Sequence, residues 1–228
     1  MAGINTESVQ RLYVAYFNRP ADPVSLATYE SLLPSDRVAT QAELEELANT
    51  YFSPSAEYTA NYSGLSNAGI VNQLYLNIFG REAEPDGLIH WAGQLSSGAQ
   101  TVASIALQLS YSAQGTDADV VANRIAASVA FTEGLDTTAE ITGFSGNSAA
   151  SSARSWLATV GSTEASKDAA IAGVDSAISS AVAAGDAASG SSYTLTTAVD
   201  SVVGSASNDT IVGTLLATGS TFTVADTI

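Results

Sequence analysis

The ten residues from Gly204 to Gly213 are the stretch whose residue types and spacing most clearly indicate a chemistry. They read GSASNDTIVG, a G-x-x-x-N-D-T-I-x-G pattern with Asn208 and Asp209 at its centre. Carboxylate and turn carbonyl oxygens are the ligands that calcium prefers, and the stacked turns of a β-roll share calcium between layers. The sequence therefore predicts calcium ligands at Asn208 and Asp209, although the G-G-x-G-x-D core of such a repeat is missing.

The sequence contains few of the residues that nucleophilic catalysis needs. The chain has no cysteine and one histidine, His90, and it contains no G-x-S-x-G turn. Clustered carboxylates could catalyse glycoside hydrolysis only if two of them faced each other across a cleft. The favoured interpretation is that they lie on solvated helix faces. Calcium ligation is the alternative. These clusters are Glu43 with Glu45 and Glu46, Glu82 with Glu84 and Asp86, and Asp117 with Asp119. We expect a protein that is not an enzyme.

Three residues in one segment are candidate glycan contacts: Arg81, Asp86 and Trp91. An aromatic ring can stack on a sugar, and charged groups can bind its polar substituents. A structural role is the competing interpretation. Arg81 and its counterpart Arg19 would then bond helix C-terminal carbonyls or pair with an acid that opens the next helix, and Trp91 would belong to the core.

The elements that must position these residues form a repeat. The stretch Val71 to Leu95 aligns with Val9 to Leu33 without a gap, and Trp91 then meets another aromatic residue, Tyr29. The matched residues of the second copy are Val71, Leu74, Tyr75, Phe79, Arg81, Ala83, Pro85, Leu88 and Leu95. Their i, i+3, i+4, i+8 spacing predicts that each copy opens with an amphipathic helix, followed by a turn and a second helix.

The copies are expected over about residues 7–52 and 68–111. In the first, Asn5 or Thr6 would cap a helix, Asp22-Pro23 would restart one, and Thr40 with Glu43 would form a capping box. Leu44, Leu47, Ala48 and Tyr51 would form the apolar face of the helix that follows. Ser53-Pro54 would end that helix and open a loop reaching Gly64.

Further helices are predicted beyond the repeat. One would be capped by Asp117 or Asp119, and a long connection would follow from Gly134 to Asn147. Two more are expected over about 149–160 and 164–184, so that an α-helical domain covers residues 1–184. Residues 185–192, GDAASGSS, resemble a linker.

Residues 193–228 are expected to begin a β region. Short runs rich in Thr, Val and Ile are bounded there by Gly, Asn, Asp and Ser, which is typical of strands and turns. The predicted strands cover 193–197, 201–203, 210–212 and 221–224. The predicted fold class is therefore mainly α, a helical bundle built on a two-copy repeat, followed by a short β segment that starts an RTX-like β-roll. Because this segment is too short to bury a core of its own, we expect the chain to be the front end of a longer protein.

Composition restricts the partners. The 228 residues include 23 acids and 7 bases, for a net charge of −16. This charge opposes binding to nucleic acid or, by simple attraction, to an anionic membrane surface, although divalent cations could bridge the chain to an anionic partner. No apolar run is long enough to span a membrane, and the N-terminal residues do not resemble a secretory signal.

Two resemblances follow from these motifs. The repeat, with V-x-x-L-Y-x-x-x-F-x-R at Val71 to Arg81, P-D-G-L at Pro85 to Leu88 and then Trp91, resembles a helical domain of secreted bacterial proteins, the DUF4214 type. The first copy departs from it, with Val24 and Ser25 where the second has Asp86 and Gly87. The segment from Asp200 onward is similar to the RTX segment of type I-secreted surface-layer (S-layer) proteins of the RsaA-like kind.

The order of the helical part, with G-L-x-x-W, then further helices and then the G-S-x-x-N-D turn, also resembles the N-terminal domain of that family. This resemblance implies a function, because that domain anchors a two-dimensional lattice to the lipopolysaccharide O-antigen in the presence of calcium. The resemblance also implies type I secretion and a place on the cell surface of a Gram-negative bacterium, with copies of the chain as lattice partners through a further C-terminal part. The competing hypothesis is a protein–protein module of a secreted RTX adhesin.

Overall fold

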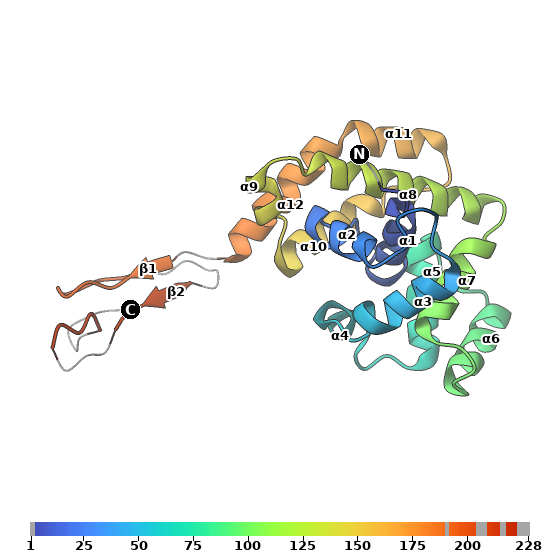
Figure 1. Cartoon of the computed structure of the whole chain (residues 1–228), viewed down its shortest axis with the longest axis horizontal. Coiled ribbons are helices and arrows are strands. Elements are labelled where there is room, and N and C mark those ends of the chain that lie inside the picture. Colours follow the sequence, from blue (N-terminus) through green and yellow to red (C-terminus); the bar gives the residue numbers. More distant parts are fainter. Residues whose placement is uncertain (1–2, 190–191, 204–208, 215–217, 223–228) are drawn as a thin grey trace.

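A computed structural model describes residues 3–189, 192–203, 209–214 and 218–222 of the chain (Figure 1). The described part is mainly helical and ends in a short two-stranded parallel sheet, so the predicted fold class is confirmed. The first repeat copy holds α1 (Thr6–Phe17), α2 (Pro23–Ser31), α3 (Gln41–Leu47) and a π-helix, η1 (Ala48–Phe52). The second copy holds α5 (Asn67–Phe79), α6 (Pro85–Ser96) and α7 (Val102–Ser112), and α4 (Ala56–Tyr62) connects the two copies.

The opening helices of the two copies, α1 and α5, pack against each other at the centre of the larger core. Each carries the same edge-to-face aromatic pair. The ring centroids of Tyr13 and Phe17 lie 5.7 Å apart in α1, and those of Tyr75 and Phe79 lie 5.4 Å apart in α5. The predicted i and i+4 face is therefore the buried face in both copies, because residues four apart lie one above the other on a helix.

The C-terminal helices form a second group. They are α8 (Thr116–Gly134), α9 (Thr138–Gly143), α10 (Gly146–Leu157), α11 (Glu164–Ala172) and α12 (Val174–Ser189). The long helix α8 contacts α1 as well as α11 and α12, so it connects this group to the repeat. α10 packs closely on α12, and Phe131, Phe144, Ala149, Ala153 and Ile178 are buried in the smaller core between α8, α9, α10 and α12.

Predicted capping residues act as expected at two helices and differently at two others. The side chain of Asp22 accepts the N–H of Ser25, and Thr40 with Glu43 forms a complete capping box. Asn5 occupies the N-cap of α1 but makes no cap bond, because its side chain binds the segment after α2 and accepts the N–H of Ala39 at 2.7 Å. The N-cap of α8 is Gly115 instead of the expected Asp117 or Asp119.

Several predicted boundaries were wrong. The loop expected up to Gly64 contains α4, whose N-cap is Ser55, and the connection expected from 134 to 147 contains α9, whose N-cap Thr137 completes a capping box. The helix expected over 164–184 is two helices, interrupted at Gly173. α12 also continues through Gly185, which is buried against the α9–α10 connection, so this helix extends into residues expected to be a linker.

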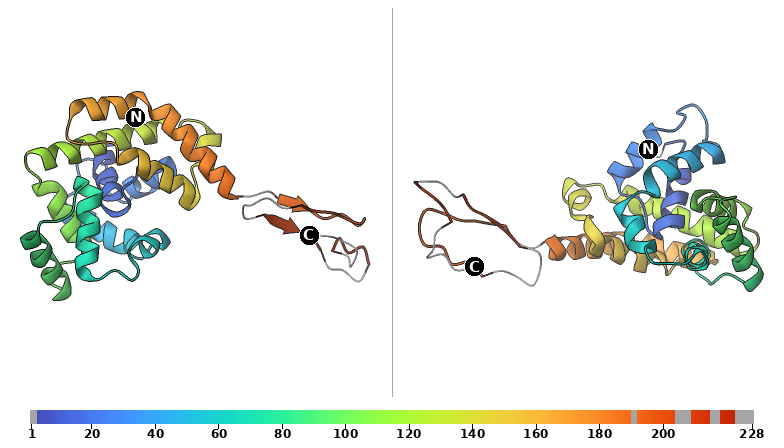
Figure 2. Two further views of the ribbon diagram at one scale, coloured as in Figure 1. Left: turned by 180° about the vertical axis from the view of Figure 1, so that it is seen from behind. Right: turned by 90° about the horizontal axis from the view of Figure 1, so that it is seen from below.

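The tail holds β1 (Ser192–Thr194) and β2 (Thr210–Val212), which pair in parallel with Ser192 opposite Thr210. Both lie beyond the end of α12, away from the helical body (Figures 1 and 2). The strand expected over 201–203 is only an isolated bridge at Ser201. Thr221 and Phe222 are a bend rather than a strand, and 223–224 lie outside the described residues.

Within the described residues, no helix combines the length and the apolar character needed to cross a lipid bilayer.

Candidate functional site

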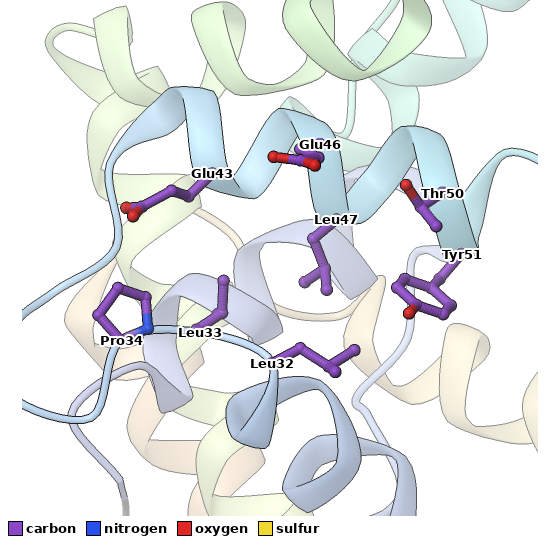
Figure 3. Close-up of a pocket in the computed structure, with 8 residues that line it drawn as sticks. All are labelled: Leu32, Leu33, Pro34, Glu43, Glu46, Leu47, Thr50 and Tyr51. Carbon is purple, nitrogen blue, oxygen red and sulfur yellow. The ribbon is translucent and has the colours of Figure 1, made fainter.

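A groove of about 390 Å³ lies between the end of α2 and the α3–η1 helix (Figure 3). We call it the α2–α3 groove, and it is lined by Leu32, Leu33, Pro34, Glu43, Glu46, Leu47, Thr50 and Tyr51. Leu47 and Tyr51 point from the helix toward the segment that carries Leu32 and Leu33. Such a mixture of apolar walls and a few polar groups, at this volume, is typical of small-molecule sites.

The π-helix decides which aromatic side chain reaches this groove. The N–H of Ser53 donates to the carbonyl of Ala48 at 2.9 Å, an i+5 bond that adds one residue to the turn. Phe52 is consequently buried, with 1% of its surface exposed, whereas Tyr51 is 44% exposed. The prediction that Tyr51 belongs to the apolar core face was therefore wrong, and the π-turn directs its ring outward.

The exposed ring of Tyr51 packs against other aromatic rings on its inner side. Its centroid lies 5.8 Å from that of Tyr29, and Tyr29 lies 5.1 Å from Phe52, which in turn packs edge-on against Tyr13. This chain of rings runs from the groove into the core of the first repeat copy. An aromatic side chain held in this way loses little conformational freedom when it binds a partner.

Two carboxylates lie on the α3 side of the groove. Glu43 accepts two hydrogen bonds from Arg37, at 2.6 and 2.8 Å, and further bonds from Thr40. The Arg37 guanidinium, together with the Thr40 N–H and hydroxyl, lowers the pKa of Glu43 to about 2. Glu46 is exposed and forms no ion pair in the described part of the chain.

Two of the three candidate glycan contacts predicted from sequence lie around Tyr75. The guanidinium of Arg81 sits 5.6 Å from the Tyr75 ring centroid and makes two hydrogen bonds to Asp117, at 3.1 and 2.6 Å. Trp91 is half-buried against the larger core, the cluster that also contains Tyr75. Asp86, the third candidate, is exposed in the first turn of α6.

The predicted pairing with an acid that opens the next helix is confirmed for Arg81, which pairs with Glu84, the N-cap residue of α6, whereas Arg19 pairs with an acid of α4 instead of the next helix, α2. Arg81 pairs with Asp117 and Glu84, and Arg19 makes two bonds to Glu57, at 2.8 and 2.6 Å. Asp117 and Glu57 each lie in the first turn of a later helix. Both arginines therefore stabilise the turn that follows the opening helix of their copy.

The predicted calcium ligands are only partly described. Asp209 is half-buried directly before β2, and Asn208 lies outside the described residues. Across the described ranges, no group of three or more His, Cys, Asp or Glu side chains is placed to hold a metal ion. His90 is exposed on α6, with its ring 4.7 Å from that of Trp91.

Two kinds of structural residue were not predicted from the sequence. Gln10 and Asn72 hold equivalent turns, and they could have been found because both are carboxamides at matching positions of the two copies. Arg124 and Arg154 bind the C-terminal carbonyls of α5 and α1, respectively. No local pattern links these arginines to helices that lie 47 and 137 residues earlier in the sequence.

No curated protein and no solved structure matches the chain. One family model matches part of it. That part begins in η1 and ends at the first residue of α8, so it covers α4 and the second repeat copy. Residues 49–116 of this chain match the family described as "Domain of unknown function (DUF4214)".

Proposed function

We propose that this chain is the N-terminal anchoring domain of a secreted surface-layer protein, and that it binds the O-antigen polysaccharide of outer-membrane lipopolysaccharide. The polysaccharide would lie in the α2–α3 groove, with calcium assisting. The chain would act without catalysis, on the outside of a Gram-negative cell that it reaches by type I secretion. This proposal rests on the sequence resemblances and on the chemistry of the groove.

The observation that carries the proposal is the outward-facing ring of Tyr51. π-Turns occur frequently at functional sites, because they interrupt regular helix packing to present a side chain. The corresponding helix of the second copy, α7, is a regular α-helix. The ring can stack on the apolar face of a sugar, while Thr50 and Glu46 offer polar groups to its hydroxyls.

Calcium would complete the polar side of this site. Calcium binds six to eight oxygen ligands, of which carboxylates supply only some. Glu46 would supply one carboxylate, and sugar hydroxyls and water would supply the remaining oxygens. A cation at this place would also reduce the repulsion between an acidic protein of net charge −16 and the anionic groups of lipopolysaccharide.

A single groove of this size would bind weakly. Many copies in a lattice would multiply the weak contacts, because each further engagement is effectively intramolecular. The proposed anchor therefore needs no deep pocket.

A second candidate is a protein–protein module of a secreted RTX adhesin, which the tail favours. β1 and β2 pair in parallel, with Ser192 opposite Thr210. The offset between these partners is twice the length of the nonapeptide repeat of a calcium-binding β-helix. Val199, Val203 and Val212 are exposed on this tail, and a protein partner would cover such side chains.

The experiment that separates the two candidates is a pull-down of the chain with smooth and with rough lipopolysaccharide, each in calcium and in EDTA. The anchor requires retention on smooth material alone, lost in EDTA. Equal failure on both materials favours the protein–protein module.

A further inference from the structure

A second, smaller cavity lies at the junction of the two repeat copies and α10. We call it the carboxamide pocket. Its volume is about 130 Å³, and it is lined by Tyr16, Phe17, Asn18, Asn61, Gln73, Asn77 and Arg154. These residues come from the end of α1, from α4 and α5, and from α10. Four of the seven are carboxamides, each of which can donate and accept hydrogen bonds.

Asn18 is the unusual residue of this pocket. It ends α1 in the left-handed conformation, with φ 50°, and it is the one described non-glycine residue with positive φ. The second copy places Gly80 there, with φ 72°. The Asn18 side-chain oxygen is buried and accepts no hydrogen bond from the described residues. A buried acceptor without a donor costs free energy, so a missing donor is expected beside it.

Other lining groups retain unused hydrogen-bonding capacity. Arg154 donates from Nε to the carbonyl of Phe17 at 2.9 Å and from Nη2 to Glu57 at 2.6 Å, so Nη1 has no partner among the described residues. Gln73 donates from Nε2 to Asn77 at 2.8 Å, which leaves its own oxygen without a donor within the same part of the chain. Among the described residues, the lining therefore carries two acceptors without a donor, the Asn18 and Gln73 oxygens, and one charged donor without an acceptor, beside the carboxamide of Asn61.

We propose that the carboxamide pocket binds an uncharged ligand group with adjacent hydroxyls, as in a small polyol. A hydroxyl can donate to the Asn18 oxygen and accept from Arg154 Nη1, because it does both at once. A carboxylate in its ionised form brings acceptors alone and leaves the Asn18 oxygen unsatisfied. The volume exceeds the ~15 Å³ of probe space that one water needs, so the site has room for more than a single structural water.

This site is separate from the α2–α3 groove, and the two share no lining residue. The proposal for the carboxamide pocket is therefore independent of the proposal that the chain binds O-antigen. The test accordingly uses small molecules and no lipopolysaccharide.

The test is a titration of the full, ¹⁵N-labelled chain followed by the side-chain amide signals in NMR spectra. Glycerol and glucose are the hydroxylic probes, and acetate is the anionic comparison. We expect saturable shifts of the Asn18 and Asn61 amide signals with a hydroxylic probe and none with acetate. Asn18→Gly should weaken that binding at least ~10-fold, the loss expected for one hydrogen bond to a buried group.

The variant is chosen so that folding is preserved. Glycine adopts the left-handed conformation without strain, as Gly80 does at the equivalent position. Asn147→Ala, which removes an exposed carboxamide outside the pocket, is the matched control and should bind like the parent. Backbone spectra should match the parent for both variants. The proposal fails if no hydroxylic probe gives saturable shifts, if acetate binds instead, or if Asn18→Gly binds as well as the parent.

Discussion

Gln10 and Asn72 occupy matching positions of the two repeat copies and hold the same turn in each. The Gln10 side-chain oxygen accepts the N–H of Ala21 at 3.0 Å, and the Asn72 oxygen accepts the N–H of Ala83 at 2.9 Å. In each copy the bond ties the opening helix to the backbone that leads into the second helix. The first copy adds a connection, because Gln10 also donates to Thr132 of α8 at 2.7 Å.

This difference predicts unequal costs of substitution. Gln10 is fully buried and bonds both Ala21 and Thr132, whereas Asn72 is half-buried and bonds Ala83. Gln10→Ala should reduce the free energy of unfolding by ~2–4 kcal/mol and Asn72→Ala by ~1 kcal/mol, as judged from the cost of unsatisfied buried groups. Urea unfolding measures both. Equal losses would contradict the role given to the Thr132 connection.

The close packing of α12 gives a second prediction. A Cβ on Gly185 would collide with the carbonyl oxygen of Gly143 and lie 3.0 Å from that of Ser145. Because these are backbone atoms, Gly185→Ala should destabilise the chain by ~1–3 kcal/mol. Gly93 of α6 is the control, since a Cβ there meets nothing within 4 Å. Gly93→Ala should stabilise by ~0.5–1 kcal/mol, and the same sign for both variants would disprove the packing argument.

Arg124 gives the third prediction. It is 3% exposed, donates to the carbonyls of Asn77 and Val160 at 2.5 and 3.1 Å, and burial lowers its pKa to about 10. Arg124→Met would leave those carbonyls without a donor and should cost ~2–4 kcal/mol, measured by urea unfolding. Arg37→Met, which removes an exposed ion pair with Glu43, should cost ~0–1 kcal/mol. A loss for Arg124→Met no larger than that of Arg37→Met would show that the carbonyl contacts contribute little.

Acid sensitivity around Glu43 gives the fourth prediction. Its pKa is lowered from 4.5 to about 2 in the folded chain, chiefly by Arg37 and then by Thr40. A lowered pKa means that the carboxylate stabilises the fold above pH 4.5, and that this contribution is lost as the pH falls toward 2. The difference in unfolding free energy between the parent and Glu43→Gln should therefore shrink across that interval.

Denaturation of both proteins at several pH values between about 2 and 6 checks this. Glu46→Gln removes a carboxylate of the same helix that has no ion pair in the described part of the chain, and it is the control for overall charge. A parent-to-Glu43→Gln difference that stays constant over this range would contradict the capping and pairing described for Glu43.

The sequence predicts those features of the fold that depend on residues close to one another in the chain. The repeat, the Asp22 cap and the Thr40–Glu43 capping box are local patterns, and all three are confirmed. The short helices α4 and α9 were missed because seven and six residues are too few to show a clear apolar period. The linker-like composition around Gly185 was misleading, because glycine there serves close packing inside a helix.

The candidate sites were harder to predict than the fold. Tyr51 was assigned to the core because a regular helical period places it there, and only the π-turn between Ala48 and Ser53 directs it outward. The orphaned oxygen of Asn18 depends on neighbours from α4, α5 and α10, which no local pattern brings together. Arg81 and Trp91, by contrast, are close in sequence and both lie around Tyr75.

Our central proposal is that the α2–α3 groove anchors the chain to O-antigen through Tyr51. The most direct test is retention on smooth lipopolysaccharide of the parent, of Tyr51→Ala and of Tyr111→Ala, in calcium and in EDTA. Tyr111 is a matched control, because it is 39% exposed and lies outside the groove. We predict retention of the parent and of Tyr111→Ala in calcium alone, with Tyr51→Ala at least ~10-fold weaker, as for loss of a binding hot spot. Retention of Tyr51→Ala equal to that of the parent, or no retention of the parent, would contradict it.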